Sequence, residues 1–229
     1  MEHSITRQEY IKELEKVQEQ VFLMGMAATR AVSRSMKSLL EMDTATAAEV
    51  MAADDQIDDM IIDIEDRCML LIAKQQPIAH DLRVLATGFK ISTDLERIGD
   101  HAFDIAKTVP LLAAGTPLEN LYYTRQLAEC AVEMLNMAMD AYRRGDVALA
   151  ESVCRKDDEM DDFFARTFME LSGQTAQDAD LARKITQLMF VARFLERIGD
   201  HATNIAEWVI YLETAERIRK IRGRVEMQG

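Results

Sequence analysis

The segment Glu-Arg-Ile-Gly-Asp-His-Ala at Glu96–Ala102 recurs without change at Glu196–Ala202. The similarity continues more loosely through the next four residues of each copy, at 103–106 and 203–206. Identity over seven consecutive polar and apolar positions is far beyond compositional accident. The sequence therefore predicts an internal duplication in which each copy folds as a similar unit.

The composition favours an all-α protein. The 229 residues include only 9 Gly and 3 Pro, whereas aliphatic residues, Ala and Met are abundant. Good helix formers with few helix breakers are typical of long helices. The length suits one large domain or two of about a hundred residues each, and the duplication favours two.

Apolar residues recur at helical spacing along three segments of the first half. The first predicted helix begins at a capping box, Thr6–Glu9, and ends near Leu40. The second begins at Asp43 and stops before Pro77, because proline disfavours helical geometry in the residue before it. The third runs from His80-Asp81 to Pro110 and contains the first copy of the repeated segment.

The second half repeats this plan. Its first helix is predicted to start at the capping box Thr116–Glu119, which has Pro at the first helical position. Gly145-Asp146 separates that helix from the next, and Gly173 ends the next one. We expect the basic tail Arg217–Arg224 to fray.

A helix with one apolar seam needs neighbours that cover it. Three such helices joined by short polar turns predict an antiparallel three-helix bundle, so the chain should form two bundles that pack as pseudo-repeats. We place the first bundle at residues 1–112 and the second at 113–229, with the boundary near Gly115.

The charge and the absence of targeting signals indicate the surroundings of the protein. A formal charge of −13 repels nucleic acid and anionic lipid, so neither is an expected partner. Met1–Glu19 is charged throughout and does not resemble a secretion signal, and no uncharged apolar run approaches the ~20 residues of a membrane span. Three scattered cysteines suit reduced thiols. We therefore expect a cytoplasmic protein.

Each copy of the repeat places two acids on one helix face. A Glu and an Asp stand four residues apart, and a third oxygen-bearing side chain follows one turn later. The two rows are Glu96, Asp100 and Asp104 in the first copy, and Glu196, Asp200 and Asn204 in the second. Like charges at this spacing are destabilising unless a cation lies between them. We expect both rows at the bundle surface, away from the main core.

The helix before each row carries its own acid pair, Asp54 and Asp58 in the first half and Asp157 and Asp161 in the second. Antiparallel packing of the two helices would bring each pair opposite the row. Carboxylates from two helices make an oxygen-rich site, so the sequence predicts a divalent or iron-type metal ion, with Mg, Mn, Fe and Zn as candidates.

Three other interpretations stay open. The acids could be solvated helix faces, partly neutralised by Arg97 and Arg197. The glycine of each repeat costs roughly 1 kcal/mol relative to Ala in a helix, so its matched placement indicates a structural or functional reason. We favour close approach of a neighbouring helix over access of a ligand to the backbone. His101 and His201 are interpreted as rim residues rather than ligands.

Enzymatic chemistry is less well supported. A ferritin-type di-iron site needs Glu-x-x-His, whereas each Glu here precedes its His by five residues. His80–Arg83 faintly resembles a histidine-kinase phosphoacceptor box, but Val84-Leu85 stand where Thr or Asn and Pro normally follow. No phosphate-cradling glycine loop and no nucleophile with its base is visible.

Several of these motifs together resemble the PhoU family of phosphate-uptake regulators over nearly the whole chain. The tandem Glu-Arg-Ile-Gly-Asp motif is the most specific of them. The others are Asp54-x-x-Ile57-Asp58, Asp157-x-x-Met160-Asp161, Ala73–Pro77, Asp81–Arg83 and the extension of the second repeat to Glu207. The second copy lacks the Asp-Leu-Arg equivalent and reads Leu181-Ala182-Arg183.

The resemblance implies two three-helix bundles, a cytoplasmic location and frequent homodimers. It also implies negative control of phosphate uptake through the phosphate-specific ABC transporter ATPase and its sensor histidine kinase, with contact to the membrane only through these partners. Some members bind metal through pairs that map onto the acids named above. The alternatives to this non-enzymatic regulator are a carboxylate-bridged metal store or metalloenzyme, and a structural bundle without a ligand.

Overall fold

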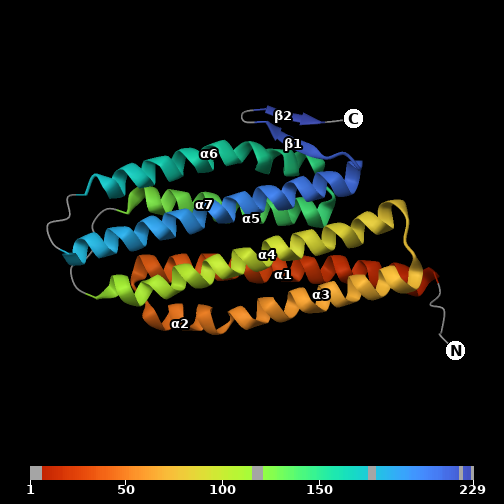
Figure 1. Ribbon diagram of the computed structural model, residues 1–229, viewed down its shortest axis with the longest axis horizontal. Coiled ribbons are helices and arrows are strands. Elements are labelled where there is room, and N and C mark those ends of the chain that lie inside the picture. Colours follow the sequence, from red (N-terminus) through yellow and green to blue (C-terminus); the bar gives the residue numbers. More distant parts are fainter. Residues whose placement is uncertain (1–6, 115–120, 175–178, 222–223, 228–229) are drawn as a thin grey trace.

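The computed structural model describes residues 7–114, 121–174, 179–221 and 224–227. Helices fill most of these ranges and form two bundles stacked side by side (Figure 1). The first bundle contains α1 (Arg7–Glu41), α2 (Thr44–Ala52), α3 (Asp54–Gln75) and α4 (Ala79–Ala113), and the second contains α5 (Tyr122–Arg144), α6 (Val147–Ser172) and α7 (Ala179–Thr214). The predicted all-α fold of two tandem three-helix bundles is confirmed.

The second predicted helix is interrupted, so the described ranges hold seven helices rather than six. Asp43 caps α2 as expected, because its side chain accepts from the backbone N–H groups of Ala45 and Thr46. The break falls at Ala53, whose N–H bonds the carbonyls of both Glu49 and Val50 at 3.2 Å. Val50 and Ile57 stay buried on either side of the break. The apolar pattern continues through it, which is why the pattern gave no sign of the break.

Two other segments differ from the expectation. α4 continues through Pro110 to Ala113, and Leu112 in this last turn is buried in the core. The tail pairs instead of fraying, as the antiparallel strands β1 (Ile218–Ile221) and β2 (Arg224–Met227). Arg217 attaches this hairpin to α7, because its guanidinium lies 5.1 Å from the ring centre of Trp208 and 5.0 Å from that of Tyr211.

The other predicted boundaries are confirmed where the structure describes them. Gln76 ends α3 in the left-handed conformation just before Pro77, and Gly145, at φ 62°, ends α5 before Asp146 caps α6. Gly173 follows the end of α6. Thr6, the Thr116–Glu119 capping box and the Gly115 boundary lie outside the described residues, and the division between residues 112 and 113 stays a prediction.

The two bundles meet through α4 and α7 on one side and through α1 and α5 on the other. α4 and α7 run in opposite directions, so the start of α4 lies beside the end of α7 (Figure 1). Arg83 there donates from Nε to the carbonyl of Leu212 at 3.0 Å. The repeated segments, one on each helix, are thereby brought to the contact between the bundles. None of the described helices is long and apolar enough to cross a membrane.

Candidate functional site

The first acid row faces the acid pair of α3, as expected from antiparallel packing. A Cβ added to Gly99 would lie 3.1 Å from Cδ1 of Ile57 and 3.5 Å from Oδ1 of Asp54. Glycine at this position therefore lets α3 approach α4 closely. Asp54 and Gly99 also line a hollow of about 290 Å³ between the helices of this bundle.

Electrostatics show that these carboxylates share one environment. Burial, with the charges of Asp58 and Asp100 acting in the same direction, raises the pKa of Asp54 to about 6. Burial also raises the pKa of Glu96, again with a contribution from Asp100. The pKa of Asp104 is raised chiefly by burial. The structure thus brings all five first-bundle candidates close enough together for their charges to interact.

Arg97 partly neutralises this cluster. Its Nη1 donates to Oδ2 of Asp100 at 2.8 Å, and its Nε lies 3.3 Å from Oε2 of Glu96. The guanidinium is about half exposed, at 56% for the side chain, so it lies over the acid row rather than under it. Arg97 therefore occupies the oxygen atoms that a metal ion would use.

The second bundle repeats the close approach but not every contact. A Cβ on Gly199 would lie 2.9 Å from Cγ of Met160. Burial raises the pKa of Glu196, and the charges of Asp200 and Asp161 add to that shift. Arg193 binds Oε1 of Glu196 at 2.6 Å, whereas Oε2 is buried without a hydrogen-bond partner in the described ranges. Arg193, not Arg197, thus makes the ion pair with Glu196.

Two predicted members of the second site have other neighbours. Asp157 is buried, at 4% exposure, and accepts from the Thr203 hydroxyl at 3.2 Å. Asp157 is therefore directed from α6 toward α7 rather than toward solvent. Asn204 is exposed and donates from Nδ2 to Oδ1 of Asp94 on α4, at 3.1 Å.

Asp94 forms the centre of a contact between the bundles that neither the apolar seams nor the acid spacing indicates. Its Oδ1 lies 2.8 Å from Nδ1 of His201, so one carboxylate contacts two α7 side chains. The pseudo-equivalent pair is different: His101 stacks on Phe194 at 5.6 Å between ring centres. Burial, with a smaller contribution from His201, lowers the pKa of His101 to about 4. Both histidines lie at the rim of the core, as expected. Asp94 and Phe194 occupy equivalent positions of the two repeats, so an alignment of the repeats would have revealed this difference.

The donor chemistry suits a hard cation, although no site is preformed. Within the described ranges, no three His, Cys, Asp or Glu side chains form a group that could hold a metal ion. Each row, together with the acid pair of the preceding helix, nevertheless offers carboxylate oxygens from two helices, and Glu196 keeps a buried oxygen without a partner among the described residues. Side-chain rotation and displacement of arginine would be needed to gather these oxygens around an ion.

Comparison with known proteins identifies the family to which this two-bundle chain belongs. The PhoU domain model matches residues 21–109 and 124–209, one match for each bundle. The chain belongs to the PhoU family. The phosphate-specific transport system accessory protein PhoU homolog of Clostridium acetobutylicum is 37% identical to it over 93% of this chain and 98% of the relative. The homolog from Aquifex aeolicus is 38% identical over 91% of this chain and 94% of the relative.

Solved structures agree with the family assignment. The crystal structure of PhoU from Pseudomonas aeruginosa superposes with a TM-score of 0.84 at 34% identity, over 89% of this chain and 98% of that one. The phosphate transport system regulatory protein PhoU from Streptococcus pneumoniae also gives 0.84, at 27% identity, over 92% of this chain and 100% of that one. The repeated segment thus belongs to a known two-bundle fold.

Proposed function

We propose that this protein is a negative regulator of phosphate uptake and phosphate-starvation signalling. In this proposal it is a cytoplasmic helical adaptor that contacts the ATPase of the phosphate-specific ABC transporter and its sensor histidine kinase. The observation that carries the proposal is the similarity, over more than nine-tenths of the chain, to phosphate-specific transport system accessory proteins. No sequence motif pairs a nucleophile with a base, which supports a non-enzymatic role.

The acid groups are proposed to bind divalent cations and to shape the surface that partners recognise. Asp54, Asp58, Glu96, Asp100 and Asp104 would hold an ion in the first bundle. Asp161, Glu196 and Asp200 would do so in the second, with Asp157 and Asn204 as weaker candidates because other side chains already contact them. A bound cation would neutralise the clustered charge and fix the paired helices against each other.

A deletion strain tests the proposal. In phosphate-rich medium, loss of the protein should derepress phosphate-starvation genes and raise phosphate uptake, both measured against the parent strain. A variant with Glu96, Asp100, Glu196 and Asp200 changed to Ala should fold yet restore repression poorly. The matched control changes four exposed acids outside the rows to Ala, namely Glu15, Glu19, Asp63 and Asp66, and should restore repression fully.

The outcomes separate the two parts of the proposal. Full repression by the four-acid variant at native expression would show that signalling does not require the acid rows or a metal bound to them. Unchanged gene expression and uptake in a deletion strain without a second PhoU-family gene would remove the regulatory role itself and leave the fold standing.

A further inference from the structure

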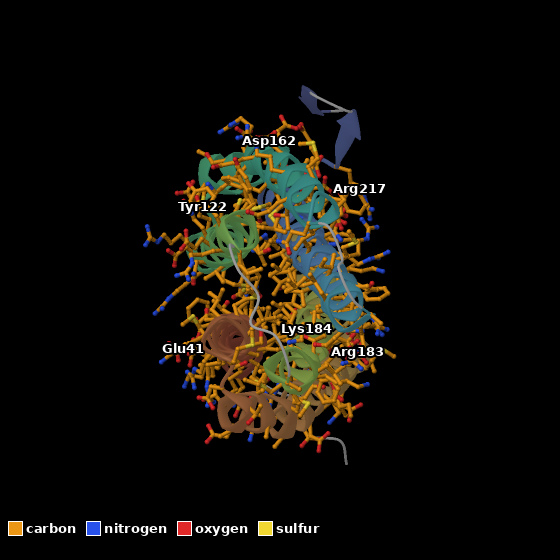
Figure 2. The ribbon with its side chains drawn as sticks, turned by 90° about the vertical axis from the view of Figure 1, so that its left-hand side faces the viewer. Glu41, Tyr122, Asp162, Arg183, Lys184 and Arg217 are labelled. Carbon is orange, nitrogen blue, oxygen red and sulfur yellow. The ribbon has the colours of Figure 1, made fainter. Side chains whose placement is uncertain are left out.

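A groove lies between α1 and α5, away from the acid rows. It has a volume of about 740 Å³ and is lined by the C-terminal part of α1 and most of one face of α5. Glu41 on α1 and Tyr122 on α5 lie on the same flank of the molecule, whereas Arg183 on α7 lies on the opposite one (Figure 2). The groove is therefore on the far side of the bundle contact from the start of α7.

The crossing of the two helices creates this groove. At Gly25 a Cβ would collide with the thioether of Met139, so the two backbones come close there. Arg143 reinforces the contact, with its guanidinium 4.6 Å from the centre of the Phe22 ring. The helices run in opposite directions, and the groove opens beyond this point, toward the end of α1 and the start of α5.

The groove has an apolar floor of helical length. Met36 and Ala128 are buried at its base, and Leu40, Val132 and Met137 are partly exposed beside them. The lining residues of α5 run from Arg125 to Asp140 and recur every three or four positions. Sixteen residues of α-helix span about 24 Å, or some four turns. An apolar channel of this length matches the apolar stripe of one amphipathic helix.

The rim of the groove is acidic. Its charged lining consists of four acids, Glu41, Glu129, Glu133 and Asp140, against two bases, Lys37 and Arg125. Lys156 pairs with Glu133 at 2.9 Å, and the exposed Arg144 lies 3.8 Å from Asp140, so the acids left to bind a partner are chiefly Glu41, Glu129 and Asp140. The chain has a net charge of −13, so a second copy of it is repelled on average by this acidic rim. Charge complementarity instead favours a helix with basic residues on both sides of its apolar stripe.

We infer that the α1–α5 groove is a docking site for a basic amphipathic helix of a partner protein. The apolar stripe lies on Met36, Leu40, Val132 and Met137, and its flanking Lys or Arg side chains face Glu41, Glu129 and Asp140. This deepens the proposed function, because it assigns the adaptor a surface on which it receives a regulated protein. It does not depend on metal binding, since the groove contains no residue of the acid rows.

A synthetic peptide tests the inference without any transporter protein. The probe is a fluorescein-labelled helical peptide of four turns with Leu at helical spacing and Lys on both flanks, and fluorescence anisotropy measures its binding to the full-length protein. Binding should be saturable, and a second peptide with Glu in place of every Lys should bind at least about tenfold more weakly.

Variants of the groove provide the controls. Glu129→Lys combined with Asp140→Lys should weaken binding of the basic peptide by roughly tenfold or more, as should Val132→Glu, a change at a partly exposed position. The matched control, Glu15→Lys with Glu19→Lys, makes the same change in net charge on the exposed, distant part of α1 and should bind as the parent does. Circular dichroism and thermal unfolding check that every variant folds.

Each other outcome overturns the inference. Equal loss in the groove and control variants would show attraction by net charge alone, and equal binding by all variants would place the peptide elsewhere. If sedimentation velocity finds a dimer that Val132→Glu converts to a monomer, the occupant is a second copy of the chain. Because the probe is synthetic, failure here leaves the regulatory role standing, whereas failure of the deletion experiment leaves the groove standing.

Discussion

Asp94 of the first bundle contacts His201 of the second, with 2.8 Å between Oδ1 and Nδ1. Both side chains are mostly buried, at 13% and 20% exposure, so solvent screens this contact less than a surface pair. At the pseudo-equivalent positions, Phe194 stacks on His101. The duplication thus produced two contacts between the same helices, one polar and one aromatic.

Removing the polar contact should destabilise the protein. Asp94→Ala leaves the partly buried His201 without its acceptor, which costs about 1–3 kcal/mol, whereas the exposed Asn204 can bond to water instead. Urea unfolding followed by circular dichroism measures the change. Asp55→Ala, at an exposed acid of α3, is the control and should stay within about 0.5 kcal/mol of the parent. A similar effect of both variants would mean that the Asp94 contact contributes nothing specific.

Converting the aromatic contact into a polar one should change a titration. Phe194→Asp places a carboxylate beside His101, whose pKa burial lowers to about 4. A neighbouring negative charge favours the imidazolium, so the pKa of His101 should rise in the variant. NMR titration of the histidine ring protons measures it, with Phe190→Asp, at an exposed position of the same helix, as the control. An unchanged titration would show that the new carboxylate turns away from His101.

The spacing of α3 and α4 depends on Gly99. Gly99→Ala gains roughly 1 kcal/mol of helix propensity but forces Ile57, 3.1 Å from the new methyl, to move at a cost of about 1–3 kcal/mol. We expect a net loss of stability in urea unfolding and a lower pKa for Asp54, because a wider gap hydrates its carboxylate. The control is Ala86→Gly, an exposed helix position where only propensity changes. A more stable Gly99→Ala protein would show that close approach is not required.

The repeat and its apolar seams were sufficient to predict the two bundles. Leu95, Ile98 and Ala102 lie on one seam and are fully buried, as are their equivalents a hundred residues later. The break at Ala53 could not be predicted, because the backbone there stays close to helical geometry and the seam is not shifted. The pairing of the tail depends on backbone hydrogen bonds and on Arg217 packing over two aromatic rings, neither of which apolar periodicity reports.

The candidate site was predicted in outline only. Spacing of four on one helix placed Glu96 beside Asp100 correctly, and antiparallel packing placed Asp54 opposite them. Burial of Asp157 and the contact of Asn204 with Asp94 depend on how α6 and α4 rotate against α7. Rotation between helices is a tertiary property, so a single helical pattern does not determine it.

Acidification should stabilise the metal-free protein through Asp54. The pKa of this carboxyl is about 6 in the folded protein, against an ordinary value of 3.8, so the folded state binds the proton more tightly than the unfolded chain. Stability from this group is present at low pH and is lost as the pH rises from about 4 to about 6. Chelator-treated protein should therefore unfold at higher urea concentration at pH 5.5 than at pH 7, and Asp54→Asn should reduce the difference. An equal pH dependence in the variant would assign it to other groups.

Arg97 should compete with divalent ions for the first acid row. Its guanidinium binds Asp100 at 2.8 Å and lies 3.3 Å from Glu96, so a cation can gather these oxygens only by displacing it. Arg97→Ala should therefore strengthen Mn²⁺ binding in the first bundle by several-fold, measured by calorimetry on chelator-treated protein. Arg155→Ala, which removes an exposed ion pair with Glu151 outside the rows, is the control for net charge. Glu96→Ala with Asp100→Ala should abolish binding in the first bundle and leave the second intact. If Arg97→Ala changes the affinity no more than Arg155→Ala does, only long-range charge is involved. If the double acid variant keeps the parent stoichiometry, these residues are not ligands.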